Sequence, residues 1–233
     1  MVFMSYVEPP VPSFLFDLDG TLIDSVYQHV IAWRTALSEI GIDLSVWRIH
    51  RRIGMSGGLF VSALLRETGR SLSRADIDLL QQAHAAQYRA QADSVTPLPG
   101  ARDLLGTLTE AGVPWAIATS GYAATARPAL ALLGLPEDTP MVTRDLVRHA
   151  KPDPDLFLAA AAELGVEPRH AMVVGDSVWD LLAARRAWAL GVGLMSGGYG
   201  REELERAGAY RVYADPAEML DRIDELGVRA NSS

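Results

Sequence analysis

The chain has 233 residues and a formal net charge of −8, and 49% of its residues are hydrophobic. This composition is typical of a globular protein with a sizeable core, and the negative charge argues against a nucleic-acid or anionic-membrane surface. Because there is no cysteine, disulfides, thiolate zinc sites and cysteine nucleophiles are excluded. An anionic small molecule stays compatible with this charge, since a metal ion and a few local cations can reverse the field at one site.

The N-terminal tail, residues 1–12, lacks the basic region and apolar stretch of a signal peptide. No apolar run in the sequence is long enough to cross a membrane. We therefore expect a cytoplasmic protein. The sequence does not predict an oligomeric state and is compatible with a monomer.

The first predicted element is a short buried strand, Phe14–Phe16, which is followed at once by two carboxylates, Asp17 and Asp19. Gly20 lets the chain turn sharply after them. Ligands of open α/β sheets bind at the carboxyl ends of the strands, so these carboxylates are candidates for a nucleophile, a metal ligand or a proton carrier. The competing interpretation is a hairpin, because Asp-Gly after a strand is also a strong turn signal.

Residues 24–96 carry helical patterns and almost no strand signal. One helix is predicted from an apolar stripe that Gly41 closes as a C-terminal cap. The stripe consists of Val30, Trp33, Leu37 and Ile40. We expect a helical cap domain, 24–96, inserted into a core domain formed by 13–23 and 97–233. The alternative is a single compact domain with a long helical crossover.

The rest of the chain alternates short β-type runs with longer helical stretches, which predicts a doubly wound parallel sheet of the Rossmann-like α/β class. The predicted strands cover 113–119, 141–143, 171–176, 192–195 and 211–213. The predicted helices cover 59–65 and 75–88 in the cap, and 101–111, 123–133, 154–164, 178–190 and 216–226 in the core.

Polar groups that suit a phosphate follow the second predicted strand and precede a helix further on. Thr119, Ser120 and Gly121 offer hydroxyls and free backbone N–H groups, although Ser and Thr also cap helices. Lys151 lies in a proline-restricted loop, where a cation can neutralise charge on a transferring phosphoryl group. Its ordinary alternative is a solvated surface lysine.

Two further carboxylates, Asp176 and Asp180, lie at the end of a strand and in the first turn of the next helix. Taken alone, they are compatible with helix capping and compensation of the helix dipole. Together with Asp17 and Asp19 they form the oxygen-rich site that Mg²⁺ prefers, and their mutual repulsion is a separate reason to expect a cation.

The order of these motifs along the chain resembles the haloacid dehalogenase superfamily of phosphohydrolases. The motifs are Asp17-Leu18-Asp19-Gly20-Thr21, Thr119, Lys151 before Pro152, and Gly175-Asp176 with Asp180. The resemblance implies that Asp17 attacks phosphorus and forms an aspartyl-phosphate, and that Asp19 protonates the leaving alcohol and later deprotonates the attacking water. It also implies that Thr119 and Lys151 hold the phosphoryl oxygens.

For the metal, the resemblance implies Mg²⁺ bound by the Asp17 carboxylate, the Asp19 backbone carbonyl and Asp176. Asp180 would orient waters or Lys151 instead of binding the ion directly. The inserted cap resembles the small helical (C1) type of phosphoglycolate phosphatases and β-phosphoglucomutases, which closes over small phosphorylated metabolites. The function expected from this resemblance is a Mg²⁺-dependent phosphatase, with no nucleic-acid or membrane partner.

Three other functions occur among proteins with this core. Dehalogenases of the family usually lack the second carboxylate of the first motif, which Asp19 supplies here. A β-phosphoglucomutase-like mutase uses the same core, but its cap signature, a basic residue followed by Ser-Arg, is not evident around Gly54–Ser56. A non-catalytic phosphate-binding or regulatory member would have lost a nucleophile or metal ligand, and none is lost.

The leaving group should be chosen by the cap, and the segment 48–58 is the best sequence candidate because it combines arginines with a flexible turn. Arg52 and Ser56 are the predicted substrate-binding residues in it. A plain interhelical turn is the alternative. Tyr122 and Trp179 are weaker candidates for flanking the substrate. The five histidines show no metal-ligand spacing and are not expected to enter the mechanism.

Overall fold

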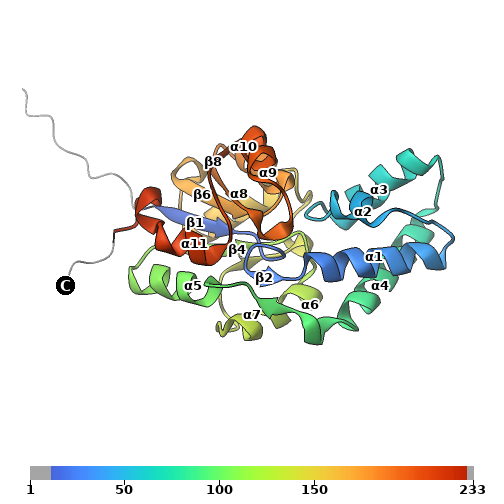
Figure 1. The fold of residues 1–233 in the computed structure, drawn as a ribbon, viewed down its shortest axis with the longest axis horizontal. Coiled ribbons are helices and arrows are strands. Elements are labelled where there is room, and N and C mark those ends of the chain that lie inside the picture. The colour runs from blue at the N-terminus through green and yellow to red at the C-terminus, as the bar shows by residue number, and fades with distance from the viewer. Residues whose placement is uncertain (1–11, 230–233) are drawn as a thin grey trace, which may run out of the picture.

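The computed structural model describes residues 12–229 and shows a six-stranded sheet in the order β5-β4-β1-β6-β7-β8 (Figure 1). Every neighbouring pair of strands in this sheet is parallel, which confirms the predicted doubly wound α/β class. Since β1 pairs with a parallel strand on each side, the hairpin interpretation of the Asp-Gly sequence is wrong. The strands are β1 (Ser13–Phe16), β4 (Trp115–Ala118), β5 (Met141–Val142), β6 (Ala171–Gly175), β7 (Leu190–Leu194) and β8 (Ala209–Tyr213).

The side chains of β1 alternate between two apolar clusters, one on each face of the sheet. Phe14 and Phe16 belong to the cluster with α5, α7 and α11, whereas Leu15 belongs to the cluster with α8 and α9. The core helices are α5 (Ala101–Glu110), α6 (Ala123–Ala126), α7 (Pro128–Leu133), α8 (Asp155–Leu164), α9 (Val178–Arg186), α10 (Arg201–Ala207) and α11 (Pro216–Asp221). Short 3₁₀ turns cover Ala92–Ser94, Arg144–Leu146, Pro168–His170, Met195–Gly197 and Ile223–Leu226. Between residues 12 and 229, no helix combines the length and apolar character that a membrane span requires.

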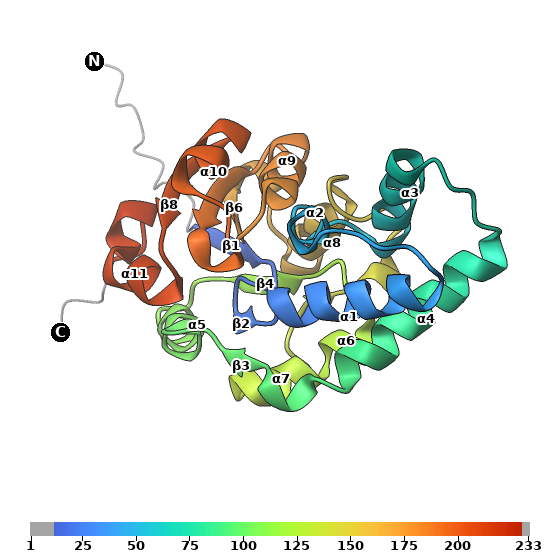
Figure 2. The same ribbon diagram turned by 45° about the vertical axis from the view of Figure 1, so that its right-hand side comes forward.

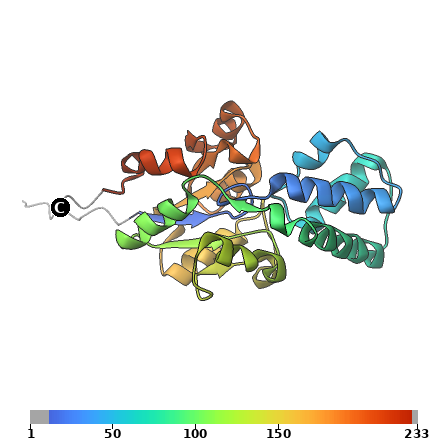
Figure 3. The ribbon, with the colours of Figure 1, turned by 60° about the horizontal axis from the view of Figure 1, so that its bottom comes forward.

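Four helices form a separate unit at one end of the molecule, as the turned views show (Figures 2 and 3). They pack around an apolar cluster of their own, in which Trp33 and Leu37 of α1 meet Phe60 and Leu64 of α3 and Leu80 of α4. The helices are α1 (Val26–Glu39), α2 (Val46–His50), α3 (Gly57–Thr68) and α4 (Arg74–Arg89). We propose that this unit is the cap domain expected from the sequence.

The two crossings between cap and core lie side by side. Ile23–Asp24 (β2) pairs antiparallel with Thr96–Pro97 (β3), and this two-stranded ladder joins the helical unit to the sheet. These strands are not predictable from the sequence, because two residues are too few to show a period-2 pattern. The proposed boundaries at 24 and 96 fall within the ladder.

Several predicted helices differ from the observed ones for identifiable reasons. The helix predicted over 123–133 is two helices, since Pro128 begins a new one after Arg127. The helix predicted over 178–190 ends at Arg186, and Leu190 opens β7 instead. Helix α10 was not predicted, because its sequence REELERA buries only Leu204 and therefore shows no apolar stripe. Ile40 is 41% exposed and does not belong to the buried stripe of α1, but Gly41 has the left-handed φ of 68° expected after a helix.

Candidate active site at the carboxyl ends of the strands

Three predicted site residues follow neighbouring strands at one edge of the sheet. Asp17 follows β1, Thr119 follows β4, and Asp176 follows β6. Because β1 is hydrogen-bonded to both β4 and β6, the three strand ends are adjacent. Gly20 turns the chain after β1 with a φ of 80°, in the region that favours glycine.

A cluster of buried carboxylates lies at this edge. Oxygens of Asp17, Asp176 and Asp180 lie within 4.8 Å of one another. Lys151 is completely buried among them and forms ion pairs with Asp17 and with Asp180, the latter with an Nζ–Oδ1 distance of 2.8 Å. The hydroxyl of Thr21 donates to Asp176 Oδ1 at 3.1 Å. The structure therefore brings together residues from three distant segments of the chain, around 17, 151 and 176–180.

Asp180 both caps a helix and contacts Lys151, so the capping role and the site role are compatible. It occupies the third position of α9, where its Oδ2 accepts hydrogen bonds from the backbone N–H and the hydroxyl of Ser177, in a capping box. Its other carboxylate oxygen faces Lys151. Capping of α9 thus fixes the carboxylate in the position from which it holds the lysine.

The charge within this cluster is unbalanced, because three carboxylates surround one ammonium group. Burial, opposed by Lys151, raises the pKa of Asp17 to about 7. Burial and the repulsion of Asp180 and Asp17 raise the pKa of Asp176 well above its ordinary value. Burial opposes the charge of Lys151, but the attraction of Asp17 and Asp180 outweighs it and raises the pKa of the lysine, so the ammonium group stays charged.

These residues fit a divalent cation. Carboxylate oxygens are the hard ligands that such ions prefer, and an added positive charge would remove the repulsion among them. Glycines also leave room for the Asp176 carboxylate: a Cβ atom at Gly197 would lie 1.7 Å from Asp176 Oδ2, and one at Gly20 would lie 2.6 Å from it. A side chain at either position would displace the carboxylate.

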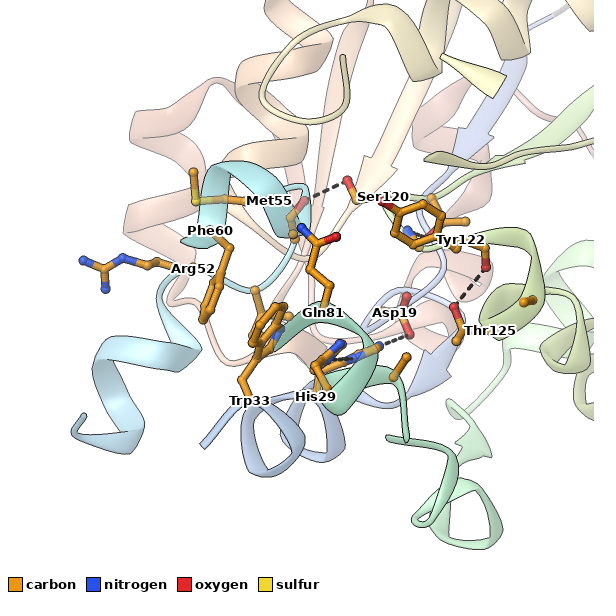
Figure 4. A pocket seen from close by; sticks show the side chains of 18 of the residues that line it. Asp19, His29, Trp33, Arg52, Met55, Phe60, Gln81, Ser120, Tyr122 and Thr125 are labelled. Carbon is orange, nitrogen blue, oxygen red and sulfur yellow. Dashed lines mark hydrogen bonds and ion pairs between the residues drawn. The ribbon is translucent and has the colours of Figure 1, made fainter. Parts of the chain in front are cut away.

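The side chain of Asp19 is not one of these clustered carboxylates, and it lines a cavity (Figure 4). Asp17 lines the same cavity. Its Oδ1 accepts a hydrogen bond from the Ser25 hydroxyl at 2.6 Å and lies 3.1 Å from His29 Nε2. Burial acts to raise the pKa of Asp19, but the attraction and hydrogen bond of His29 and the hydrogen bond of Ser25 outweigh it and lower the pKa. The two carboxylates of the first motif therefore occupy different surroundings, which suits different roles.

The residues predicted to bind phosphate, Thr119, Ser120 and Gly121, line the same cavity. Thr119 is buried, and its Oγ1 accepts a hydrogen bond from the Gly121 N–H at 2.9 Å, which orders the turn after β4. The Ser120 hydroxyl donates to the Gly54 carbonyl oxygen at 3.1 Å. This bond joins the core turn to the loop between α2 and α3 in the cap.

The cavity has a volume of about 420 Å³ and lies between the strand ends and the cap (Figure 4). Besides Ser120, two other core side chains bind the cap at the carbonyl oxygen of Arg51. Trp179 Nε1 donates to it at 3.3 Å, and the Tyr199 hydroxyl donates to it at 2.9 Å. The His50 ring bonds the Gly197 carbonyl at 2.7 Å. These contacts hold the cap over the strand ends, and the volume of the cavity suits a small substrate. They also give Trp179 a role in holding the cap instead of flanking a substrate.

Arg52 and Ser56 do not reach the centre of the site. The guanidinium of Arg52 forms an ion pair with Glu67 and donates to the Arg48 carbonyl oxygen at 2.6 Å, and it points away from the cavity (Figure 4). Ser56 is buried as the N-cap of α3, where its hydroxyl accepts from the Leu59 N–H at 3.4 Å. This geometry gives no support to their predicted contact with substrate.

Two histidines that were not expected to take part do contact the site. His29 binds Asp19 through Nε2, and its Nδ1 lies 3.1 Å from Nε2 of His84 on α4. Both rings line the cavity. The available sequence signal was the four-residue spacing of Ser25, His29 and Trp33, which places them on one side of α1. His84 has the same spacing with Leu80 and Tyr88 on α4, but this spacing does not show that the two helices bring the histidines together.

Comparisons with known proteins agree with this site. A family model described as haloacid dehalogenase-like hydrolase matches residues 11–187, and a second model of HAD-like hydrolases matches residues 149–226. Hexitol phosphatase A of Escherichia coli (strain K12) is 35% identical over 178 residues, covering 75% of this chain and 78% of that protein. Phosphoglycolate phosphatase of Rhodospirillum rubrum is 34% identical over 216 residues, covering 89% of this chain and 88% of that protein.

Among solved structures, the crystal structure of a hydrolase from Pseudomonas syringae is 52% identical and has a TM-score of 0.90, covering 92% of this chain and 98% of that one. The chain belongs to the haloacid dehalogenase-like hydrolase family. With curated relatives named as phosphatases, it is an enzyme of the phosphoric monoester hydrolase class. The resemblance inferred from the motifs is thus confirmed.

Proposed function

We propose that this enzyme hydrolyses a small phosphorylated metabolite, with Mg²⁺ as its metal and Asp17 as its covalent nucleophile. The observation that carries the proposal is the buried cluster of Asp17, Asp176, Asp180 and Lys151, from which Asp17 lines the cavity between core and cap. Phosphoryl transfer depends on positioning and charge neutralisation more than on bond-making groups, and this cluster supplies both.

In the first step, a carboxylate oxygen of Asp17 attacks phosphorus, and the bond between phosphorus and the substrate alcohol oxygen breaks. Asp19 gives its proton to that oxygen, because an alkoxide leaves poorly without one. Without substrate, His29 and Ser25 keep the pKa of Asp19 low, so its carboxylate is ionised. The negative charge of a bound phosphoryl group raises the pKa of Asp19, which allows the carboxylate to take up the proton that it then donates.

In the second step, Asp19 takes a proton from water, which attacks phosphorus and releases phosphate from Asp17. Lys151 and the Thr119–Gly121 turn hold the phosphoryl oxygens during both steps, as positive charge and N–H groups do in other phosphate sites. Asp180 keeps Lys151 in place. The cap excludes bulk water, so that the proton of Asp19 goes to the leaving group.

The metal would be held by Asp17 and Asp176, with the Asp19 backbone carbonyl as a further ligand and Asp180 beside them. When bound, Mg²⁺ supplies the positive charge that removes the repulsion between a nucleophilic carboxylate and a phosphate dianion. Carboxylate ligands and a phosphate substrate favour this ion.

Replacement of Asp17 tests the mechanism. Asp17→Asn exchanges one oxygen for an isosteric amide, and we expect it to abolish turnover of p-nitrophenyl phosphate in Mg²⁺ while the circular dichroism spectrum and monodispersity stay unchanged. Asp138→Asn, at an exposed position away from the site, is the matched control and should retain full activity. Wild-type turnover by Asp17→Asn would overturn the covalent mechanism, and full activity in EDTA would overturn the metal requirement.

The mutase alternative has its own test. With β-glucose 1-phosphate and a bisphosphate activator, a phosphatase releases inorganic phosphate, whereas a mutase accumulates glucose 6-phosphate. We expect inorganic phosphate. The cytoplasmic location and the compatibility with a monomer, both expected from the sequence, stay predictions.

A further inference from the structure

The part of the cavity beyond the phosphoryl site has a composition that limits the leaving group. One wall is an aromatic series from the cap, in which the Trp33 ring stacks on Phe60 at 4.3 Å and on His84 at 4.1 Å between centroids. Across the cavity stands Tyr122 of the core (Figure 4). The Tyr122 side chain is 47% exposed and has no aromatic partner within residues 12–229. The space between these surfaces is apolar on two sides, as in most small-molecule sites.

A neutral polar group projects between these walls. The side-chain amide of Gln81, on α4, points into the cavity (Figure 4). It forms no hydrogen bond with any other residue in the part of the chain that the structure describes. An amide offers two donors and one acceptor, which matches the hydroxyl groups of a polyol, since each hydroxyl both donates and accepts.

The charges around this space disfavour an anionic leaving group. Asp19 and the exposed Asp78 line it. Of the two arginines that touch the cavity, Arg52 is engaged by Glu67 and points away. Arg89 is exposed at the last position of α4, where a solvated cation contributes little to binding. A carboxylate on the leaving group would therefore face other carboxylates without a cation directed at it.

The volume of the cavity also bears on the size of the leaving group. About 420 Å³ lies within the range of about 300–1,000 Å³ that is typical of small-molecule sites. This volume includes the phosphoryl site, because Asp17 and Thr119 also line the cavity, and it leaves room for a leaving group larger than two carbons. The curated relatives do not decide the question, because one is named for a hexitol and another for phosphoglycolate.

We propose that the leaving group is an uncharged, polyhydroxylated alcohol, either a sugar or a polyol, held between Tyr122 and the Trp33 wall with its hydroxyls bound by Gln81. This inference rests on the proposed phosphatase function. Gln81 and Tyr122 are then specificity-determining residues for that reaction. Tyr122 was a weaker candidate for flanking the substrate from the sequence alone, whereas Gln81 was not a candidate.

The test compares leaving groups and variants in Mg²⁺, with phosphate release as the readout. The substrates are a hexitol phosphate, a cyclic hexose phosphate, phosphoglycolate and p-nitrophenyl phosphate. We expect kcat/KM for at least one of the two sugar-type substrates to exceed that for phosphoglycolate by at least about tenfold. The ratio between the hexitol and hexose phosphates tells whether the alcohol is open-chain or cyclic.

The variants are Gln81→Leu, which keeps the size of the side chain and removes its hydrogen bonds, and Tyr122→Ala, at an exposed position that the fold does not depend on. Each should lower the ratio of kcat/KM for the preferred sugar-type substrate to that for p-nitrophenyl phosphate by about tenfold, mainly through KM. Gln87→Leu, on the same helix but outside the cavity, should leave this ratio unchanged. Equal ratios in wild type and both site variants would overturn the proposal.

A preference for phosphoglycolate that is lost on Arg89→Gln would also overturn it, because the site would then be built for a carboxylate. Such a result leaves the phosphatase function standing. Absence of phosphate release from all four substrates, p-nitrophenyl phosphate included, would instead count against the proposed function itself.

Discussion

The core edge and the cap wall face each other across one cavity, yet they are built from opposite kinds of side chain. The core contributes ionised groups that hold one another in place, with Lys151 completely buried between Asp17 and Asp180. The cap contributes aromatic rings and the neutral amide of Gln81, with Trp33 between Phe60 and His84, and its charged residues Asp78 and Arg89 are exposed. This difference separates the chemistry from the choice of leaving group, and the His29–Asp19 contact links a cap side chain directly to a carboxylate of the first motif.

The largest effect is expected from the core. Lys151→Met keeps the apolar length of the side chain but removes the charge that faces the phosphoryl oxygens and two carboxylates. We expect kcat to fall by about 10³-fold, the scale of losing a key electrostatic group at a transition state. Steady-state kinetics with the preferred substrate measure this. A decrease in kcat of less than about tenfold would contradict the proposal that Lys151 neutralises charge on the phosphoryl group.

The core should also respond to pH through its carboxylates. The pKa of Asp17 is about 7 in the folded protein against 3.8 as the ordinary value. Its contribution to the stability of the metal-free protein is therefore complete below pH 3.8 and is lost as the pH rises through 7, and Asp176 acts in the same direction. A cation binds the deprotonated groups, so Mg²⁺ affinity should rise about 30-fold between pH 5.5 and pH 8.

Thermal unfolding with and without Mg²⁺ at the two pH values measures this linkage. The shift in Tm caused by Mg²⁺ should be clearly larger at pH 8. An equal shift at both pH values would mean that these carboxylates are already ionised at pH 5.5.

The contact between the two regions should have an intermediate effect. His29→Ala removes one of the two groups that hold Asp19, and we expect kcat for an alkyl phosphate to fall about tenfold. The loss should be smaller for p-nitrophenyl phosphate, because its leaving group needs little help from a proton. His149→Ala, an exposed histidine away from the cavity, is the control. Equal losses on both substrates would argue that His29 only supports the fold.

The smallest effect is expected at the contact between the cap and the Thr119–Gly121 turn of the core. Ser120→Ala removes the hydrogen bond to the Gly54 carbonyl and should raise KM by about threefold, in keeping with one net hydrogen bond. The thermal stability should hardly change. A loss in kcat as large as that of Lys151→Met would show that Ser120 belongs to the chemistry of the core.

The same contrast explains what the sequence could predict. Asp17, Thr119 and Asp176 follow strands that a local apolar pattern reveals, and the parallel topology then forces their convergence. Gln81 has no local signal, and the spacing of His84 with Leu80 and Tyr88 predicts a buried face of α4 but not the contact with His29. They reach the cavity because α4 packs along α1, and that packing depends on Trp33, Phe60 and Leu80 together. Pro128 is a sequence signal for a break between two helices, whereas the charged α10 shows no apolar pattern from which a helix could be predicted.

The central claim is that Asp17 carries the phosphoryl group, and one measurement tests it directly. Asp19→Asn should slow the second step, in which water attacks the aspartyl-phosphate, more than the first, in which Asp17 attacks p-nitrophenyl phosphate. The leaving group of this substrate departs without an acid. Incubation of this variant with p-nitrophenyl phosphate and Mg²⁺, followed by acid quench and peptide mass spectrometry, should find the mass of one phosphoryl group on Asp17. A phosphoryl group on another residue, or none on a variant that still releases p-nitrophenol, would contradict the account.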